Sequence, residues 1–184
     1  ITLYQNALAI NPDYTKARLA LGMVLQNQGK PEEALTIYKN ALAIAPKEPD
    51  VYNQLGLALA DSGKMDQATT RYRRALAINP QYAPAYNNLG LIRAVQNNLP
   101  QAVNLYRKAL AINPDYAEAH VNLGVACLGQ NRLPQAITHL RQALRRNPDL
   151  PEAHANLAIA YARTGQANKA TTHCHEALKR KPTC

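Results

Sequence analysis

Apolar residues recur along this chain every three or four positions, which is the spacing of one face of an α-helix. Two such patterns alternate. The first is seen in Tyr52, Leu55, Gly56 and Leu59, and the second in Ala34, Tyr38, Ala41 and Leu42. Short turn signals separate them, as in Ser62-Gly63-Lys64 and Asn97-Asn98. The sequence therefore predicts an all-α fold built from pairs of short helices.

The helix pairs repeat with a fixed period of 34 residues, which proline marks most clearly. The proline column is Pro12, Pro46, Pro80, Pro114, Pro148 and Pro182. Two alanine columns keep the same step: Ala34, Ala68, Ala102, Ala136 and Ala170, and Ala7, Ala41, Ala75, Ala109, Ala143 and Ala177. We therefore expect a single array, with a half repeat over 1–14 followed by five full repeats at 15–48, 49–82, 83–116, 117–150 and 151–184.

Proline and capping residues indicate where the helices begin and end. Pro cannot continue a helix, so the Asn-Pro-Asp-Tyr segments are expected to end each repeat. Three prolines fall in the first turn of a predicted second helix, where a missing N–H is tolerated: Pro31, Pro100 and Pro134. Two acidic pairs have the spacing of capping boxes at the start of a first helix: Asp115 with Glu118, and Asp149 with Glu152.

The period and the columns resemble the tetratricopeptide repeat (TPR) family over the entire chain. The fullest match to the family pattern runs through Tyr52, Leu55, Gly56, Leu59, Ala68, Tyr72 and Pro80. The resemblance implies a right-handed alpha-alpha superhelix of antiparallel helix pairs, whose first helices line a concave, partner-binding face. Departures are few: Arg18 stands in the leading column, and Cys174 replaces the later aromatic residue. As a small apolar side chain, Cys174 is expected to be buried.

Composition excludes several classes of protein. Apolar residues make up 47% of the chain and charged residues 18%, and no stretch approaches the roughly 18 uninterrupted apolar residues of a spanning helix. The three cysteines are odd in number and have no metal-like spacing, which favours a reducing compartment: Cys127, Cys174 and Cys184. Because no secretory leader is evident, the sequence predicts a cytoplasmic location.

Few residues remain for chemistry once the repeat columns are assigned. Seven of the eight glycines belong to the glycine column or the turns, and Gly129 lies beside a turn, so no phosphate-binding loop is left. The consecutive residues His173, Cys174 and His175 point in different directions on a helix. His120 and His154 replace the leading tyrosine and are expected to pack between helices. The sequence predicts no catalytic residue, no metal site and no cofactor.

The predicted first helices carry a second apolar line beyond their core stripe, formed by Met23, Leu57, Leu91, Val125 and Ile159. A solvated helix face should be polar there. The line is therefore either cover for the neighbouring repeat or a contact surface. Beside it runs a row of side-chain amides, formed by Gln54, Asn88, Asn122 and Asn156, with Asn53 and Asn87 adjacent.

An amide offers both a donor and an acceptor, so a row of amides can pair with the peptide bonds of an extended partner. The row is similar to the asparagine ladder of the O-GlcNAc transferases, while the alternative is that these amides fix local structure. The candidate partner-binding residues are Asn53, Gln54, Leu57, Asn87, Asn88, Leu91, Asn122, Val125, Asn156 and Ile159.

Positive charge is unevenly distributed. The net charge is +9, and residues 61–184 carry sixteen Lys/Arg against seven Asp/Glu. A column of cations on the second helices is expected to face outward: Lys39, Arg73, Arg107 and Arg141. No aromatic residue is interleaved with these cations for base stacking, so we expect a solvated face rather than nucleic-acid or membrane binding.

Two functions fit these features. The first is a non-catalytic scaffold that binds an extended peptide or protein segment in the concave groove. The alternative is the recognition arm of a larger enzyme, such as an O-GlcNAc-transferase-like glycosyltransferase. The partner is a protein or peptide in either case, with no small-molecule substrate expected.

The two ends of the chain differ in character. The apolar face of the N-terminal half repeat, with Leu3 and Ile10, has no partner helix, so we expect the natural array to continue upstream and this end to self-associate. Arg146 and Arg180 replace the isoleucines of earlier repeats, which makes the last repeats more polar. Cys184 is therefore expected to lie near the end of the array.

Overall fold

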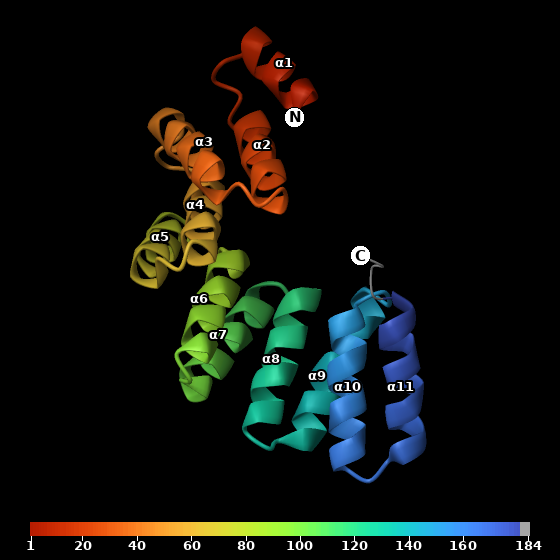
Figure 1. Cartoon of the computed structure of the whole chain (residues 1–184). Coiled ribbons are helices and arrows are strands. Elements are labelled where there is room, and N and C mark those ends of the chain that lie inside the picture. Colours follow the sequence, from red (N-terminus) through yellow and green to blue (C-terminus); the bar gives the residue numbers. More distant parts are fainter. Residues whose placement is uncertain (181–184) are drawn as a thin grey trace. The chain divides into compact units, whose positions relative to one another are not determined.

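The computed structural model describes residues 1–180, which form α-helices joined by short turns, so the predicted all-α fold is confirmed (Figure 1). Pro182 and Cys184 lie outside the described residues. By its contacts the chain forms two compact units, Ile1–Asn88 and a second that begins at Leu89. The division into a half repeat and five full repeats stays a prediction.

The first unit contains α1 (Thr2–Ile10), α2 (Thr15–Asn27), α3 (Pro31–Ile44), α4 (Pro49–Asp61), α5 (Met65–Ile78) and the start of α6 (Ala83–Val95). The second contains the rest of α6, α7 (Leu99–Ile112), α8 (Ala117–Gly129), α9 (Leu133–Arg146), α10 (Pro151–Arg163) and α11 (Ala167–Arg180). Even-numbered helices are the first helices of the pairs, and odd-numbered helices from α3 onward are the second helices.

The turn inside each helix pair contains one residue with a left-handed backbone. These residues are Gly29, Gly63, Asn97, Asn131 and Gly165, with φ between 58° and 75°. Only glycine, and to a lesser degree asparagine, adopts this conformation at low cost. At Gly63 it lets the N–H of Lys64 reach back to the carbonyl of Leu59, 2.8 Å away, which closes α4. The predicted turn signals are confirmed.

Asparagine shapes four of the five connections between repeats, and here the predicted capping boxes are wrong. The helix α8 begins at Ala117 with Tyr116 as its N-cap, so Asp115 stands one residue too early to cap it. Instead, Asn113 Oδ1 accepts a hydrogen bond from the N–H of Asp115 at 3.1 Å. Asn147 does the same for Asp149, again at 3.1 Å. The Asn-Pro-Asp segments thus fold as Asx turns.

The core of each unit is a row of rings and small residues. Tyr38, Tyr72 and Tyr106 are at most 1% exposed. Each ring lies against a glycine of the first helix: a Cβ added to Gly56 would stand 2.5 Å from Cε1 of Tyr72. The alanine columns are fully buried where they meet the partner helix, as at Ala68 and Ala75. The glycine and alanine columns therefore set how closely the helices of a pair approach.

Candidate partner-binding face

In four of the five first helices, the side chain of the leading column bonds a proline carbonyl six residues earlier and so ties the helix to the preceding connection. Tyr52 Oη donates to the carbonyl oxygen of Pro46 at 3.1 Å, six residues earlier. The guanidinium of Arg18 donates to the Pro12 carbonyl in the same way. His120 and His154 place Nε2 at 3.0 and 3.1 Å from the carbonyls of Pro114 and Pro148. Arg, Tyr and His are interchangeable here because each has a donor that reaches this carbonyl.

Most of the second apolar line is exposed on these first helices. Met23 of α2 is 47% exposed, Leu91 of α6 39%, Val125 of α8 37% and Ile159 of α10 50%. Leu57 of α4 is half-buried. The outer part of the line is therefore open to solvent in both units, so the line is available as a contact surface.

The amides do not form one uniform row. Asn53 and Asn88 are buried, and Nδ2 of Asn88 donates to Oδ1 of Asn53 at 2.8 Å, which links α6 to α4. Asn87 is also buried, and its Nδ2 lies 3.4 Å from Oδ1 of Asn88. Asn156 is half-buried, and its Nδ2 donates to the Glu152 carbonyl of its own helix at 2.9 Å. The three buried asparagines of the first unit thus stabilise packing.

Two predicted site residues of the first unit line a small hollow. Gln54 and Leu57 of α4 border a cavity of about 220 Å³, together with Met23 of α2. At its edge Nε2 of Gln26 donates to Asp61 at 2.7 Å, and Tyr38 donates to the Oε1 of Gln26 at 2.6 Å. The hollow is lined by both apolar and polar side chains, so it suits a short, partly apolar side chain of a binding partner.

In the second unit, Asn122 and Val125 lie on α8, and Asn156 and Ile159 lie on α10. Asn122 is half-buried beside the exposed Val125. The helices α8 and α10 contact each other directly. The predicted residues of these two helices therefore belong to adjacent stretches of one surface, with an amide and an exposed aliphatic side chain on each helix.

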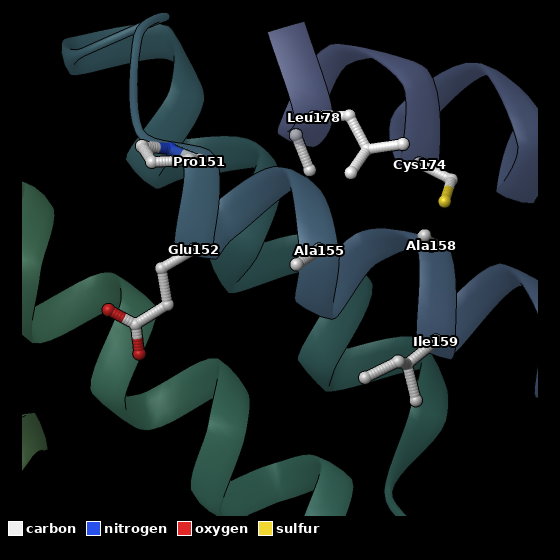
Figure 2. Close-up of a pocket in the computed structure, with 8 residues that line it drawn as sticks. Pro151, Glu152, Ala155, Ala158, Ile159, Cys174 and Leu178 are labelled. Atoms are coloured by element: carbon white, nitrogen blue, oxygen red, sulfur yellow. The ribbon is translucent and has the colours of Figure 1, made fainter. Parts of the chain in front are cut away.

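A larger apolar hollow of about 530 Å³ lies between α10 and α11. Figure 2 shows Cys174 and Leu178 of α11 facing Ala155 and Ala158 of α10 across it. One repeat earlier, the equivalent face of α8 and α9 is packed beneath α10. On α10 and α11 no helix within residues 1–180 covers that face. The expectation that Cys174 is buried is therefore wrong: its side chain is exposed.

Several buried ionisable side chains have shifted pKa values with a plain physical cause. Burial raises the pKa of Tyr38, Tyr72 and Tyr106, and a nearby Asp61 adds to the effect at the first two. Burial also raises the pKa of the Cys127 thiol, against the charges of Arg132 and Arg107. These groups stay protonated at neutral pH and serve as packing residues.

Across residues 1–180, no three His, Cys, Asp or Glu side chains come together in a way that would hold a metal ion. Nor is any helix in that range long and apolar enough to cross a membrane. The predicted outward cations are exposed: Lys39, Arg73, Arg107 and Arg141.

Comparison with known families decides the classification. A family model described as tetratricopeptide repeat matches residues 13–81, and one described as TPR repeat matches residues 91–131 and 126–165. The chain belongs to the tetratricopeptide repeat family. No curated protein sequence matches this TPR chain. TPR repeats mediate protein–protein interactions, so membership of this family makes the chain a protein–protein interaction scaffold.

Solved structures with the same fold include PilF of Pseudomonas aeruginosa, with a TM-score of 0.81 and 22% identity over 92% of this chain and 78% of that one. TTC0263 of Thermus thermophilus, a thermophilic TPR protein, has a TM-score of 0.78 and 26% identity over 92% of each chain. YrrB, described as a TPR protein with an unusual peptide-binding site, has a TM-score of 0.62 and 18% identity over 97% of this chain and 92% of that one.

Proposed function

We propose that this TPR chain is a non-catalytic scaffold that binds an extended segment of a partner protein across its first helices. The observation that carries the proposal is the exposed apolar line, because Met23, Leu91, Val125 and Ile159 stay open to solvent at equivalent positions of four repeats. Soluble monomers rarely repeat an exposed aliphatic side chain at a fixed structural position without a contact to make. The peptide-binding site named for YrrB supports the same use of this fold.

The spacing of the helices indicates what the partner presents. Packed helices lie roughly 8–10 Å apart. An extended segment in the polyproline II conformation has three residues per turn and rises about 3.1 Å per residue, so side chains three residues apart lie on one face, about 9 Å from each other. A segment that crosses α8 and α10 therefore meets Val125 and Ile159 with apolar side chains three residues apart. The amides of Asn122 and Asn156 lie beside this path and can pair with the segment's peptide groups.

A peptide-display selection against the full chain tests the proposal. Selected peptides should lose binding when Val125→Asp and Ile159→Asp are combined. Each half-exposed side chain contributes about 1 kcal/mol, so both together contribute about 2 kcal/mol, or roughly thirtyfold in Kd. The matched control combines Leu3→Asp with Ile10→Asp, which adds the same charge at residues that are 76% and 87% exposed. We expect this control to bind within about twofold of the unmodified chain.

Peptides that bind the Val125→Asp/Ile159→Asp chain as tightly as the unmodified chain would place the binding surface elsewhere. Melting temperatures of both variants should match the parent, because none of the four side chains is buried. The enzyme-arm alternative, the cytoplasmic location and the N-terminal self-association stay predictions.

A further inference from the structure

Two histidine pairs occupy equivalent places in the second unit. Nδ1 of His120 on α8 lies 3.3 Å from Nδ1 of His139 on α9. One repeat later in the sequence, Nδ1 of His154 on α10 lies 2.9 Å from Nδ1 of His173 on α11. The first histidine of each pair also bonds the carbonyl of Pro114 or Pro148. Each pair therefore joins a first helix, a second helix and the connection that precedes them.

The carbonyl partner determines which nitrogens carry protons. A carbonyl only accepts, so Nε2 of His120 must be protonated, and in the neutral ring its Nδ1 is then an acceptor. The proton between the rings therefore belongs to Nδ1 of His139, which donates to His120. The same logic makes His173 the donor to His154. This is the less common tautomer of a neutral histidine, held in place by its partner.

Acid acts on such a pair in two steps. The first proton enters at Nε2 of His139, which is not part of the contact between the rings, and the bond survives. The second proton can enter only at Nδ1 of His120. Both Nδ1 atoms then carry hydrogen, so the hydrogen bond is lost and two positive rings face each other.

The surroundings of the pairs oppose protonation. Burial lowers the pKa of His120; the Pro114 carbonyl and Asp115 raise it, and Arg146 lowers it. Burial, then the charges of His120 and Arg107, lower the pKa of His139.

At the second pair, burial, followed by the charges of His154 and Arg141, lowers the pKa of His173. Tyr161 stacks on the His173 ring with centroids 5.5 Å apart, and Nζ of Lys169 lies over the same tyrosine ring, 5.4 Å from its centroid. Arg180 stands near the same connection, paired with Asp149 at 3.0 Å. Cations from α7 and α9 thus lie near the first pair, and cations from α9 and α11 near the second.

We propose that the two histidine pairs are acid-sensitive hydrogen-bonded links. They join α8 to α9 and α10 to α11 at neutral pH, and each link is lost when a second proton enters the pair. Because burial lowers the folded pKa of His120, His139 and His173 below the unfolded value of about 6.5, the unfolded chain binds more protons near that pH. The stabilisation is therefore fully present above about pH 6.5 and declines as the pH falls through the folded values.

The first unit lacks this device. The positions equivalent to the histidine pairs hold Arg18 with Ile37 in one repeat and Tyr52 with Arg71 in the next. None of these four positions holds a histidine, which is the side chain that changes charge in this pH range. Acid should therefore loosen α8–α11 while α2–α5 keep their packing, which makes the first unit an internal control.

Nuclear magnetic resonance of the full chain tests the proton assignment without any substitution. At about pH 7.5, His139 and His173 should be protonated at Nδ1, and His120 and His154 at Nε2. Amide hydrogen exchange, corrected for the intrinsic effect of pH, should rise roughly tenfold more in α8–α11 than in α2–α5 between about pH 7.5 and pH 5.

A variant that copies the third repeat, where Tyr86 and Leu105 hold these positions, should abolish the excess exchange. It carries His120→Tyr, His139→Leu, His154→Tyr and His173→Leu. The control His175→Gln changes the remaining histidine, which is exposed, and should keep the excess.

An equal rise in both units, or an excess that survives in the four-residue variant, would overturn the proposal. So would finding His139 and His173 protonated only at Nε2 at neutral pH. This last measurement uses the unmodified chain and decides the matter even if the variant does not fold. It is also independent of partner binding, so it can fail while the proposed scaffold function stands.

Discussion

The close approach of glycine and ring in each helix pair leads to a prediction about Gly56→Ala. A Cβ at this position would stand 2.5 Å from Cε1 and 2.8 Å from Cδ1 of Tyr72, well inside van der Waals contact. The ring cannot move aside, because Tyr72 is only 1% exposed. Overpacking of this kind costs about 3 kcal/mol at the upper end of its usual range. Alanine recovers about 1 kcal/mol through its better helix propensity.

We therefore expect Gly56→Ala to lower the free energy of unfolding by about 2 kcal/mol, which corresponds to a fall in Tm of roughly 4–8 °C. Urea denaturation followed by circular dichroism measures the change. The chain itself suggests the compensating variant. At the only repeat where alanine replaces this glycine, Ala158, the ring position holds the small Cys174. In a Tyr72→Cys background, Gly56→Ala should therefore be neutral or slightly stabilising.

The coupling between the two substitutions should be about 2–3 kcal/mol in a double-mutant cycle. Gly63→Ala serves as the control, because nothing lies within 4 Å of its added Cβ and its cost comes from a φ of +75°. That cost, about 1 kcal/mol, should be the same with or without Tyr72. If Gly56→Ala destabilises equally in both backgrounds, the collision with the ring is not what selects glycine here.

Two further predictions concern single side chains. Asn88→Ala should lower the free energy of unfolding by about 1–3 kcal/mol, because it leaves the buried Oδ1 of Asn53 without the 2.8 Å hydrogen bond from α6. Urea denaturation measures the change, and an unchanged midpoint would show that this bond is not needed for packing. In a Cys184→Ser background, a maleimide should add one label per folded chain, at the exposed Cys174. A second label should appear only after unfolding, because Cys127 is buried and burial raises the pKa of its thiol. Two labels on the folded chain, counted by mass spectrometry, would contradict this.

Local signals in the sequence were enough to predict the helices and their turns. The apolar spacing sets which face of each helix is buried, and the turn at Gly63 depends on a backbone angle that few residues adopt. Both features depend on residues close together in the chain, and the same local pattern recurs five times with the 34-residue period. For this reason the all-α fold and the positions of Pro31 and Pro100 in the first turn of their helices are confirmed.

The exposed apolar line could also be seen in advance, but its openness could not. Whether Val125 is cover or contact depends on how α8 packs, and one contact of that packing is the bond from His120 to the Pro114 carbonyl six residues earlier. Arg18, Tyr52 and His120 look unrelated as residue types. Their common role, a hydrogen bond to the proline carbonyl six residues earlier, is seen only in the folded structure.

The sequence by itself determined the period, the helical class and the alternation of first and second helices, because these rest on contacts within one turn or one hairpin. Only the tertiary structure decided that Asn88 bonds to Asn53, that Cys174 is exposed and that His120 faces His139. These contacts join residues 19 to 35 positions apart or depend on what covers a face. Helix packing brings such side chains together, and no local pattern records the distance between them.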